Sequence, residues 1–455
     1  MDTYTTKFGK TGIVVEGFTF RLDKKTKSTS LWRCTVPGCK ARCTTDTTIT
    51  ALISASGEHS HPCSSESIEK KNIRASCKRK AIEHPNARPT KLVCTELENS
   101  SLDFSEVKLL RDAVYRERLK HRPKLPKNRE DVFEILEKYK QDSNEPASET
   151  ILVNDPDTKI IMLGTSDTIA FLATSEHIYG DGTFKVCPKF FYQVYTFHGF
   201  RNGIYVPCVT FILPDKTNET YVHMLGHLQD ACSTRDISIL FTTMHLDLEQ
   251  AMHSAVRQFW PHVIIKACQF HVRQAWYRKI QSLGLTTEYT NCDSPVGQWL
   301  RLFFGLPLIP LEDIEECFAF CIMQDSPNDE KAMDFADYIL KFYIESTSKF
   351  PPALWSNQNH EGKTTNACES FHCHFRENFN CDHPNIFLFI ETFNSELKTA
   401  ALKIKSSCNR TPIKRKKQRI REKQLDEDLQ TYKRGDISLM SYLKKVCYKM
   451  LPVKL

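Results

Sequence analysis

Residues 177–213, HIYGDGTFKVCPKFFYQVYTFHGFRNGIYVPCVTFIL, are the longest passage of strand-forming residues in the chain. Aromatic and β-branched residues dominate three runs within it: 177–185, 190–199 and 204–213. The pattern predicts three consecutive antiparallel strands with a tight hairpin at Asn202-Gly203, because such turns require positive φ angles. Asp181 then lies inside the first strand, where an unpaired buried carboxylate is costly. Asp181 therefore either has a function or belongs to an ordinary bulge or turn at Asp181-Gly182, and the sequence leaves both open.

The composition limits the class of protein. The chain has 455 residues, enough for about two to four domains. Its 62 Lys and Arg against 55 Asp and Glu give a net charge of +7, a mild excess that by itself identifies no nucleic-acid partner. The N-terminal MDTYTTKFGK lacks an apolar segment, and no stretch approaches the ~18 apolar residues of a membrane span. We therefore expect an intracellular protein without a membrane segment, whose 18 cysteines are thiols or metal ligands rather than disulfides.

Residues 8–62 have the pattern of a small β domain with its own ligand set. Short alternating strands are followed by Cys34 and Cys39 around a Pro-Gly turn, and by the pair His59 and His61. Two thiolates and two imidazoles suit a tetrahedral zinc ion, and a small domain with few apolar residues needs such a crosslink. We predict a structural Zn²⁺ site; unrelated thiols beside surface histidines are the alternative. Because alternate strand residues point to opposite faces, both histidines must lie where a strand ends or twists.

Five short motifs in this unit form a recognisable set: Phe8-Gly9-Lys10, Gly17-Phe18-Thr19-Phe20, Trp32-Arg33-Cys34, Cys39-Lys40-Ala41-Arg42 and His59-Ser60-His61. Together they resemble a FLYWCH-type zinc finger. That family is related to the WRKY and GCM DNA-binding folds, in which a zinc-pinned antiparallel sheet presents a strand to the major groove. The resemblance implies binding of double-stranded DNA or of protein through Arg33, Lys40, Arg42 and the basic turn at residues 24–27. Any one of these side chains could equally belong to a solvated surface.

Two segments follow the finger. Residues 63–103 are rich in Ser, Lys and Glu without an apolar period, which predicts a basic flexible linker. Lys78-Arg79-Lys80 within it is a candidate nuclear localisation signal, although short basic runs also arise by chance. Residues 104–150 have helical periodicity with many basic residues, so we predict a basic helical region that either contacts DNA or is simply solvated.

The next predicted domain spans residues 151–405. Its three central strands are followed by a helix, an apolar strand that ends on Asp247, an amphipathic helix and a second buried strand. This order matches an RNase H-like fold, which would place Asp247 at a strand end beside Asp181. Two carboxylates on neighbouring strands can bind a hard divalent cation. The predicted fold class is therefore α+β: a zinc-stabilised antiparallel β domain followed by an RNase H-like α/β domain.

Motifs in this domain point to a second family: YGDGTFK at residues 179–185, DLEQA at 247–251 and CQFHVRQAWYRK at 268–279. In combination they resemble the Mutator-like element (MULE) transposase domain, over most of residues 105–400. The resemblance implies a DDE triad of Asp181, Asp247 and Glu369, with an all-helical insertion at about 286–355 before the third acid. It also implies that Cys268 and His271 support the active site; a buried strand cysteine and a helix-starting histidine are the alternative.

Three acids suit the chemistry of DNA strand cleavage and strand transfer. Both reactions are in-line displacements at phosphorus, and two Mg²⁺ or Mn²⁺ ions held by Asp181, Asp247 and Glu369 would assist the attacking and leaving oxygens. The family usually has an aromatic residue after the second acid, whereas this chain has Leu248, so Glu249 is a rival for Asp247. The Cys- and His-rich run at 368–383 is a weak candidate for a further zinc site, and packing around Glu369 is the preferred interpretation.

Residues 406–455, with Lys414-Arg415-Lys416-Lys417, are predicted as a basic C-terminal helical tail that binds the DNA backbone or acts as a second nuclear signal. The sequence as a whole predicts a nuclear transposase that cleaves and joins transposon ends as a homo-oligomer on double-stranded DNA. The alternative is a domesticated, non-catalytic zinc-dependent DNA-binding protein or transcription regulator. Retention of all three acids favours the enzyme without establishing activity.

Overall fold

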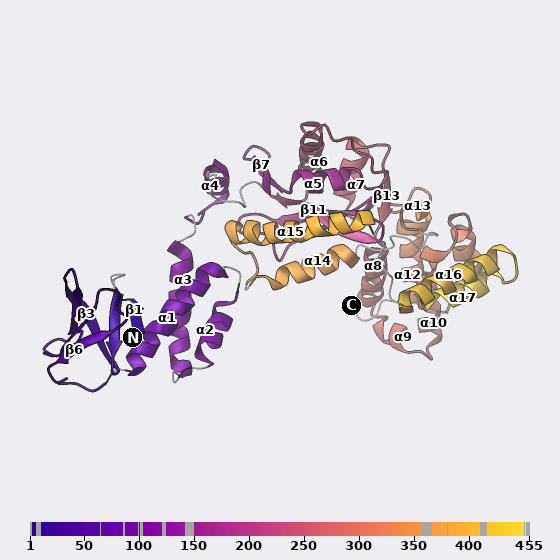
Figure 1. The fold of residues 1–455 in the computed structure, drawn as a ribbon. Helices are drawn as coiled ribbons and strands as arrows, with labels where there is room; N and C mark the ends of the chain where they lie inside the picture. The colour runs from indigo at the N-terminus through magenta and orange to yellow at the C-terminus, as the bar shows by residue number, and fades with distance from the viewer. Residues whose placement is uncertain are drawn as a thin grey trace. The chain divides into compact units, whose positions relative to one another are not determined.

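The computed structural model describes residues 2–5, 11–63, 65–84, 87–98, 100, 103–120, 124–141, 150–356, 366–379, 381–409, 416–449 and 451. Phe8-Gly9-Lys10, Thr365 and Lys414-Arg415 lie outside the described residues. The fold is α+β, with an antiparallel sheet at the N-terminus and a helical C-terminal region (Figure 1). The chain divides into two compact units, Met1–Leu125 and Pro126–Leu455.

The first unit begins with a six-stranded antiparallel sheet in which each strand pairs with its neighbour in sequence. Its strands are β1 (Asp2–Thr5), β2 (Thr11–Val15), β3 (Phe18–Lys25), β4 (Thr29–Cys34), β5 (Arg42–Asp46) and β6 (Leu52–Ser56). Ile13, Phe20 and Trp32 form the centre of a small core on this sheet. The indole Nε1 of Trp32 donates a hydrogen bond to Thr45 Oγ1 at 2.9 Å, so the buried polar group has a partner.

The structure corrects the prediction of a flexible linker at residues 63–103. Two helices form there, α1 (Ser65–Glu83) and α2 (Pro89–Leu97), and they pack against α3 (Val107–Lys120), which follows the short helix η1 (Phe104–Glu106). The apolar residues that α1 contributes are few and small, but Ile73, Cys77 and Ala81 recur every four residues and therefore share one face. Tertiary packing on this narrow face stabilises a helix whose composition suggested disorder.

Charged contacts add to this packing. Lys78 and Lys80 of the predicted nuclear signal pair with Glu117 and Glu96, with a Lys78 Nζ to Glu117 Oε2 distance of 3.3 Å. Arg118 points inward rather than toward solvent: its Nη2 donates to the carbonyl oxygens of His84 and Ala87 at 2.7 and 2.8 Å. It therefore satisfies carbonyls at and beyond the end of α1. The predicted basic helical region at 104–150 is divided, because α3 lies in the first unit and α4 (Arg129–Gln141) in the second.

The second unit is built on a seven-stranded sheet with the order β13-β12-β9-β10-β11-β8-β7. Its strands are β7 (Ile151–Asp155), β8 (Ile160–Leu163), β9 (His177–Thr183), β10 (Gln193–Arg201), β11 (Ile204–Leu213), β12 (Thr243–Leu246) and β13 (Ile264–Ala267). β12 is parallel to both of its neighbours, and the other pairs are antiparallel. The three predicted strands are confirmed, and Asn202 and Gly203 turn the second hairpin with φ angles of 51° and 79°.

Helices cover both faces of this sheet, as strand alternation requires (Figure 1). Ile160 and Met162 pack in one core with α5 (Ser166–Ala173), α6 (Asn218–Ser233) and α7 (Gln250–Phe259). Ile161 and Leu163 pack in the other with α4, α14 (Asn366–Glu377) and α15 (Ile386–Asn409). The helix α8 (Gln269–Ser282) follows β13 directly and leads into a helical region.

This helical region comprises residues 286–355 and the C-terminal helices. Its elements are α9 (Thr286–Thr290), α10 (Pro295–Leu302), η3 (Phe303–Leu308), η4 (Leu311–Asp313), α11 (Ile314–Glu316), η5 (Cys317–Ile322), η6 (Met323–Asp325), α12 (Glu330–Ile339), η7 (Leu340–Ile344), α13 (Pro352–Trp355), α16 (Lys416–Lys433) and α17 (Leu439–Cys447). Tyr442 donates to Leu308 O at 3.1 Å and Tyr432 to Asp313 Oδ2 at 2.8 Å. The predicted tail is therefore, from residue 416, an integral part of this region. None of the described helices is long and apolar enough to cross a membrane.

Candidate functional site

The first candidate site is the cluster of Cys34, Cys39, His59 and His61 in the N-terminal sheet. Cys34 ends β4, Cys39 lies in the following loop, and both histidines follow the end of β6, as strand alternation predicted. Cys34 Sγ lies 3.1 Å from His61 Nε2, and Cys39 Sγ lies 3.5 Å from His59 Nδ1. All four ligand atoms lie within 4.8 Å of one another. This is the donor set and spacing of a structural zinc site.

The surroundings of the cluster fix its side chains. The Phe18 ring stacks on His59 with a centroid distance of 3.6 Å and an interplanar angle of 5°. Hydrogen bonding to the Ala41 backbone lowers the pKa of Cys39 to about 6, which favours the thiolate that metals bind. Burial raises the pKa of Cys34. Cys63 is not part of this cluster, and its Sγ donates to Gly17 O at 3.2 Å.

A row of arginines crosses the same sheet. Arg33 on β4 is paired in register with Arg21 on β3 and with Arg42 on β5, and all three are exposed. Asp23 lies 3.5 Å from Arg33 Nε and 3.2 Å from Arg42 Nη1, so one acid aligns two of the three guanidinium groups. Arg33 and Arg42 were predicted as DNA contacts together with Lys40, which is exposed in the loop before β5. Sequence reasoning missed Arg21, because its place in the row depends on strand register.

The second candidate site lies at the carboxyl ends of three adjacent parallel strands. Asp181 pairs regularly with Thr196 inside β9, without a bulge, and only 5% of the residue is exposed. A Cβ at the following Gly182 would lie 1.9 Å from Gln193 Nε2, so a larger residue there would require the Gln193 side chain to move. The β12–β9 register pairs His245 with Tyr179, which brings Asp247 level with Asp181 two residues on. The β12–β13 register likewise pairs Leu246 with Ala267, so Cys268 is level with Asp247.

Asp181 has a partner that the sequence did not predict. His372 Nδ1 lies 3.1 Å from Asp181 Oδ2, and the two side chains are only 9% and 7% exposed. The signal was available in part, because His372 and Glu369 are three residues apart on α14 and therefore share a face. The sequence did not predict which strand this face of α14 packs against.

Glu369 lies with the C-x-x-H pair rather than in one compact group with both aspartates. Its Oε1 is 3.7 Å from His271 Nε2, and ligand atoms of Cys268, His271 and Glu369 all lie within 4.8 Å of one another. Burial alone would lower the pKa of His271, but hydrogen bonding with Cys268 and the charges of Cys268, Asp181 and Asp247 raise it to about 9. Burial raises the pKa of Glu369, with a further contribution from Asp181.

The geometry also separates Asp247 from its rival Glu249. Asp247 Oδ1 accepts from the Glu249 backbone at 3.0 Å, and His253 Nε2 lies 2.7 Å from Asp247 O. Burial raises the pKa of Asp247, and the nearby Asp181 raises it further. Glu249 is directed elsewhere: Tyr221 donates to its Oε2 at 2.9 Å, and Lys216 Nζ lies 3.8 Å from its Oε1. Asp247 is thus the acid that shares the site of Asp181.

Comparison with known families agrees with both sites. Residues 177–275 match the family model of the MULE transposase domain. Residues 3–61 match that of the FLYWCH zinc finger domain. The chain thus combines a FLYWCH finger with a MULE transposase domain, as its motifs indicated. A search of curated proteins finds no match.

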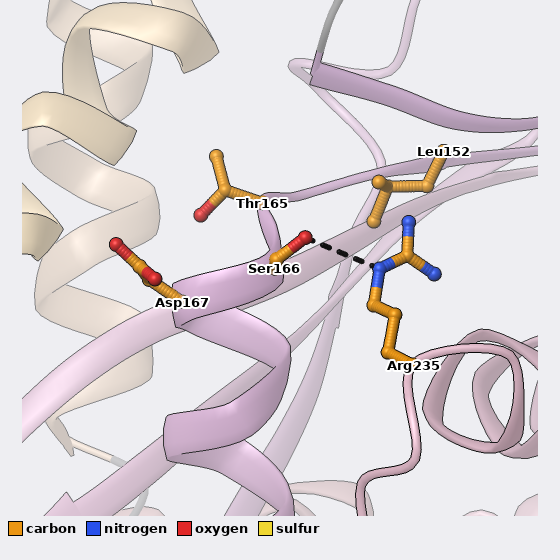
Figure 2. A pocket seen from close by; sticks show the side chains of 5 residues that line it. All are labelled: Leu152, Thr165, Ser166, Asp167 and Arg235. Atoms are coloured by element: carbon orange, nitrogen blue, oxygen red, sulfur yellow. Dashed lines mark hydrogen bonds between the residues drawn. The ribbon is translucent and has the colours of Figure 1, made fainter.

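The MULE match contains Asp181, Asp247, Cys268 and His271, whereas α14 with Glu369 lies beyond it. Within the described residues of the run at 368–383, only Glu369 belongs to a cluster with metal-ligand spacing, so the further zinc site gains no support there. A cavity of about 370 Å³ lies at the start of α5, lined by Leu152, Thr165, Ser166, Asp167 and Arg235 (Figure 2). Arg235 Nε donates to Ser166 Oγ there at 3.2 Å. This cavity shares no residue with the candidate site.

Proposed function

We propose that this chain is a DNA transposase that uses its MULE domain for metal-dependent strand cleavage and strand transfer and its FLYWCH finger to bind the transposon ends. The observation that carries the proposal is the row of Asp181, Asp247 and Cys268 across three adjacent parallel strands. Acids at the carboxyl ends of neighbouring strands can converge on one substrate phosphate.

The sheet supports an RNase H-like core for this reaction. The order β11-β10-β9-β12-β13 places three antiparallel strands beside two parallel ones, and β8 and β7 extend the sheet beyond β11. The helices between residues 286 and 355 then form the insertion before α14, which supplies Glu369 as the third acid. In this arrangement the catalytic triad is Asp181, Asp247 and Glu369.

The residues of the site fit a hard cation at the two aspartates. Asp181 is buried and Asp247 is half-buried; desolvation raises the pKa of Asp247 and the nearby Asp181 adds to this, so an Mg²⁺ or Mn²⁺ ion would relieve an electrostatic cost. Such ions supply activation of the attacking oxygen and stabilisation of the leaving oxygen. Asp181 and Asp247 would bind these ions and orient them toward the phosphate. His372 holds the Asp181 carboxylate in place through its Oδ2. The fit of Glu369 to the same ions is weaker, because Cys268 and His271 are its nearest candidate co-ligands.

The finger supports recognition of double-stranded DNA. The exposed row of Arg21, Arg33 and Arg42, with Lys40 beside it, offers charges that phosphates or guanine edges can accept. We propose that the protein acts in the nucleus and assembles as a homo-oligomer on its DNA, since two transposon ends must be processed together.

The test is a cleavage and joining assay with full-length protein on DNA that flanks its gene, in Mg²⁺ or Mn²⁺. Asp181→Asn, Asp247→Asn and Glu369→Gln should each abolish cutting while DNA binding is retained. Glu249→Gln is the matched control: it removes a nearby acid of similar burial that hydrogen-bonds Tyr221, and should leave cutting largely intact. Light scattering of the protein on a DNA end measures its oligomeric state.

Two outcomes decide between the enzyme and a domesticated DNA-binding protein. Cutting by the wild type that disappears in the three acid variants supports the triad. Zinc-dependent DNA binding without any cutting, identical in wild type and variants, refutes the catalytic assignment and leaves a transcription regulator or another non-catalytic DNA-binding protein.

A further inference from the structure

Cys268, His271 and Glu369 form a compact group from three different places in the fold. Cys268 follows β13 and precedes α8, His271 lies in the first turn of α8, and Glu369 lies in the first turn of α14. One ligand atom of each lies within 4.8 Å of the other two. The finger ligands meet the same criterion, and in the described part of the chain these are the two groups of this kind.

Hydrogen bonds inside this group do not satisfy the Glu369 carboxylate. His271 Nε2 and Glu369 Oε1 are 3.7 Å apart, beyond hydrogen-bonding distance. Glu369 Oε1 is a buried atom without a hydrogen-bond partner. Buried polar atoms normally have partners, so this arrangement points to a missing one.

The spacing suits an ion. Two ligands bound at ~2.0–2.2 Å with tetrahedral angles lie ~3.3–3.6 Å apart. The 3.7 Å between His271 Nε2 and Glu369 Oε1 is close to that value, as is the 3.5 Å between Cys39 Sγ and His59 Nδ1 in the finger. A thiolate beside an imidazole selects Zn²⁺ over Mg²⁺, which prefers oxygen ligands and octahedral geometry.

We propose that Cys268, His271 and Glu369 bind a second Zn²⁺ ion at the carboxyl end of β13, with a fourth position open to water. The ion crosslinks α14 to the start of α8, which fixes the helix that also presents His372 to Asp181. This zinc ion uses Glu369 as a ligand and therefore competes with Mg²⁺ for the third acid of the proposed triad. The site itself stands whether or not the domain cleaves DNA, because binding requires only the three ligands.

Zinc stoichiometry of the full-length protein tests the proposal. After desalting, elemental analysis should find two zinc ions per chain, one for each ligand group. Cys268→Ala and Glu369→Gln should each lose one of the two, and Cys34→Ala should lose the other. Cys232→Ala is the matched control: this buried thiol lies on α6, outside both groups, and its loss should leave both ions.

Cobalt substitution keeps the test decisive if Cys268→Ala folds poorly. In a Cys34→Ala, Cys39→Ala background the remaining site should show a thiolate-to-cobalt charge-transfer band from one cysteine, and Glu369→Gln should shift its visible d–d bands. A wild type with one zinc ion that is lost in Cys34→Ala, or a second zinc ion that survives both Cys268→Ala and Glu369→Gln, overturns the proposal. Neither result depends on DNA cleavage, so it is distinguishable from failure of the transposase assignment.

Discussion

Removal of the His372 imidazole should expose the cost of burying Asp181. The two groups meet at 3.1 Å, and their side chains are 9% and 7% exposed, so water cannot replace the lost partner well. A hydrogen bond to a charged group contributes ~1.5–3 kcal/mol, and a buried carboxylate that loses its partner forfeits that contribution. We expect His372→Ala to lower the free energy of unfolding of the second unit by about 3 kcal/mol in metal-free buffer.

Part of that loss comes from packing, since the His372 ring also contacts Phe371. A double-mutant cycle with Asp181→Asn isolates the pair, because the isosteric amide removes the charge but keeps the shape. The coupling energy should be at least about 1.5 kcal/mol. Urea unfolding followed by tryptophan fluorescence measures it well, since four of the five tryptophans lie in the second unit and only Trp32 in the first. A coupling below about 0.5 kcal/mol, the error of such cycles, would refute a structural role for the contact.

Four further outcomes follow from other parts of the chain. Arg118→Met removes a charged donor from backbone carbonyls at and beyond the end of α1 and should lower the stability of this helix by about 3 kcal/mol. Hydrogen exchange of the α1 amides should therefore accelerate ~100-fold, and unprotected amides in the wild type would contradict the helix itself. Arg33→Ala should weaken binding to transposon-end DNA and, if it contacts phosphate, reduce the salt slope of log K by ~1, whereas an unchanged slope and affinity would remove the arginine row from the interface. Chelation of zinc should unfold the finger, seen as loss of its strand signal in circular dichroism, because metal binding supplies much of the folding free energy of such domains; a finger that keeps its sheet without zinc would contradict this. Burial lowers the pKa of His227 although Asp155 opposes the shift, so the unfolded chain binds a proton there more readily than the folded protein does. The free energy of unfolding should therefore fall as the pH drops below ~6.5. His227→Gln should flatten this dependence between about pH 7.5 and 5.5, and equal slopes for both proteins would contradict it.

The sequence predicted the elements whose signals are local. Strand alternation and the Asn202-Gly203 turn were sufficient for β9, β10 and β11, because the pleat and the turn geometry are set by neighbouring residues. The apolar strand that was predicted to end on Asp247 is shorter than its apolar run, residues 237–247: only Thr243–Leu246 pair as β12, and Phe241 packs against Trp260. Hydrophobicity indicates burial in both cases but does not distinguish a paired strand from a buried loop.

What the sequence missed depended on contacts between distant segments. α1 looked like a linker because three small apolar residues do not make an obvious stripe until α3 packs on them. The basic residues of α3 suggested a solvated or DNA-facing surface, yet Arg118 is 8% exposed and binds backbone carbonyls. Arg21 joins Arg33 only through strand register. Composition therefore predicted the charge of these segments but not which way the charged side chains point or what they contact.

In the candidate site, too, local signals were predictable and contacts between distant segments were not. The proximity of Asp181 and Asp247 was predictable, because the expected strand order places the two strand ends side by side. The motif that carries Cys268 and His271 was visible as well, but its meaning changes once Glu369 lies beside it. That third residue comes from a helix whose position the sequence did not determine.

Glu369 connects the two proposals and makes them test each other. It shares one face of α14 with His372, so any crosslink of Glu369 to Cys268 and His271 also sets how firmly His372 contacts Asp181. If zinc binds there, the coupling between His372 and Asp181 should weaken in Cys268→Ala. If zinc does not bind, that coupling should be the same in both backgrounds, and Glu369 stays available to Mg²⁺. The double-mutant cycle repeated in Cys268→Ala therefore reports whether α14 is held by a metal ion or only by its packing against the sheet.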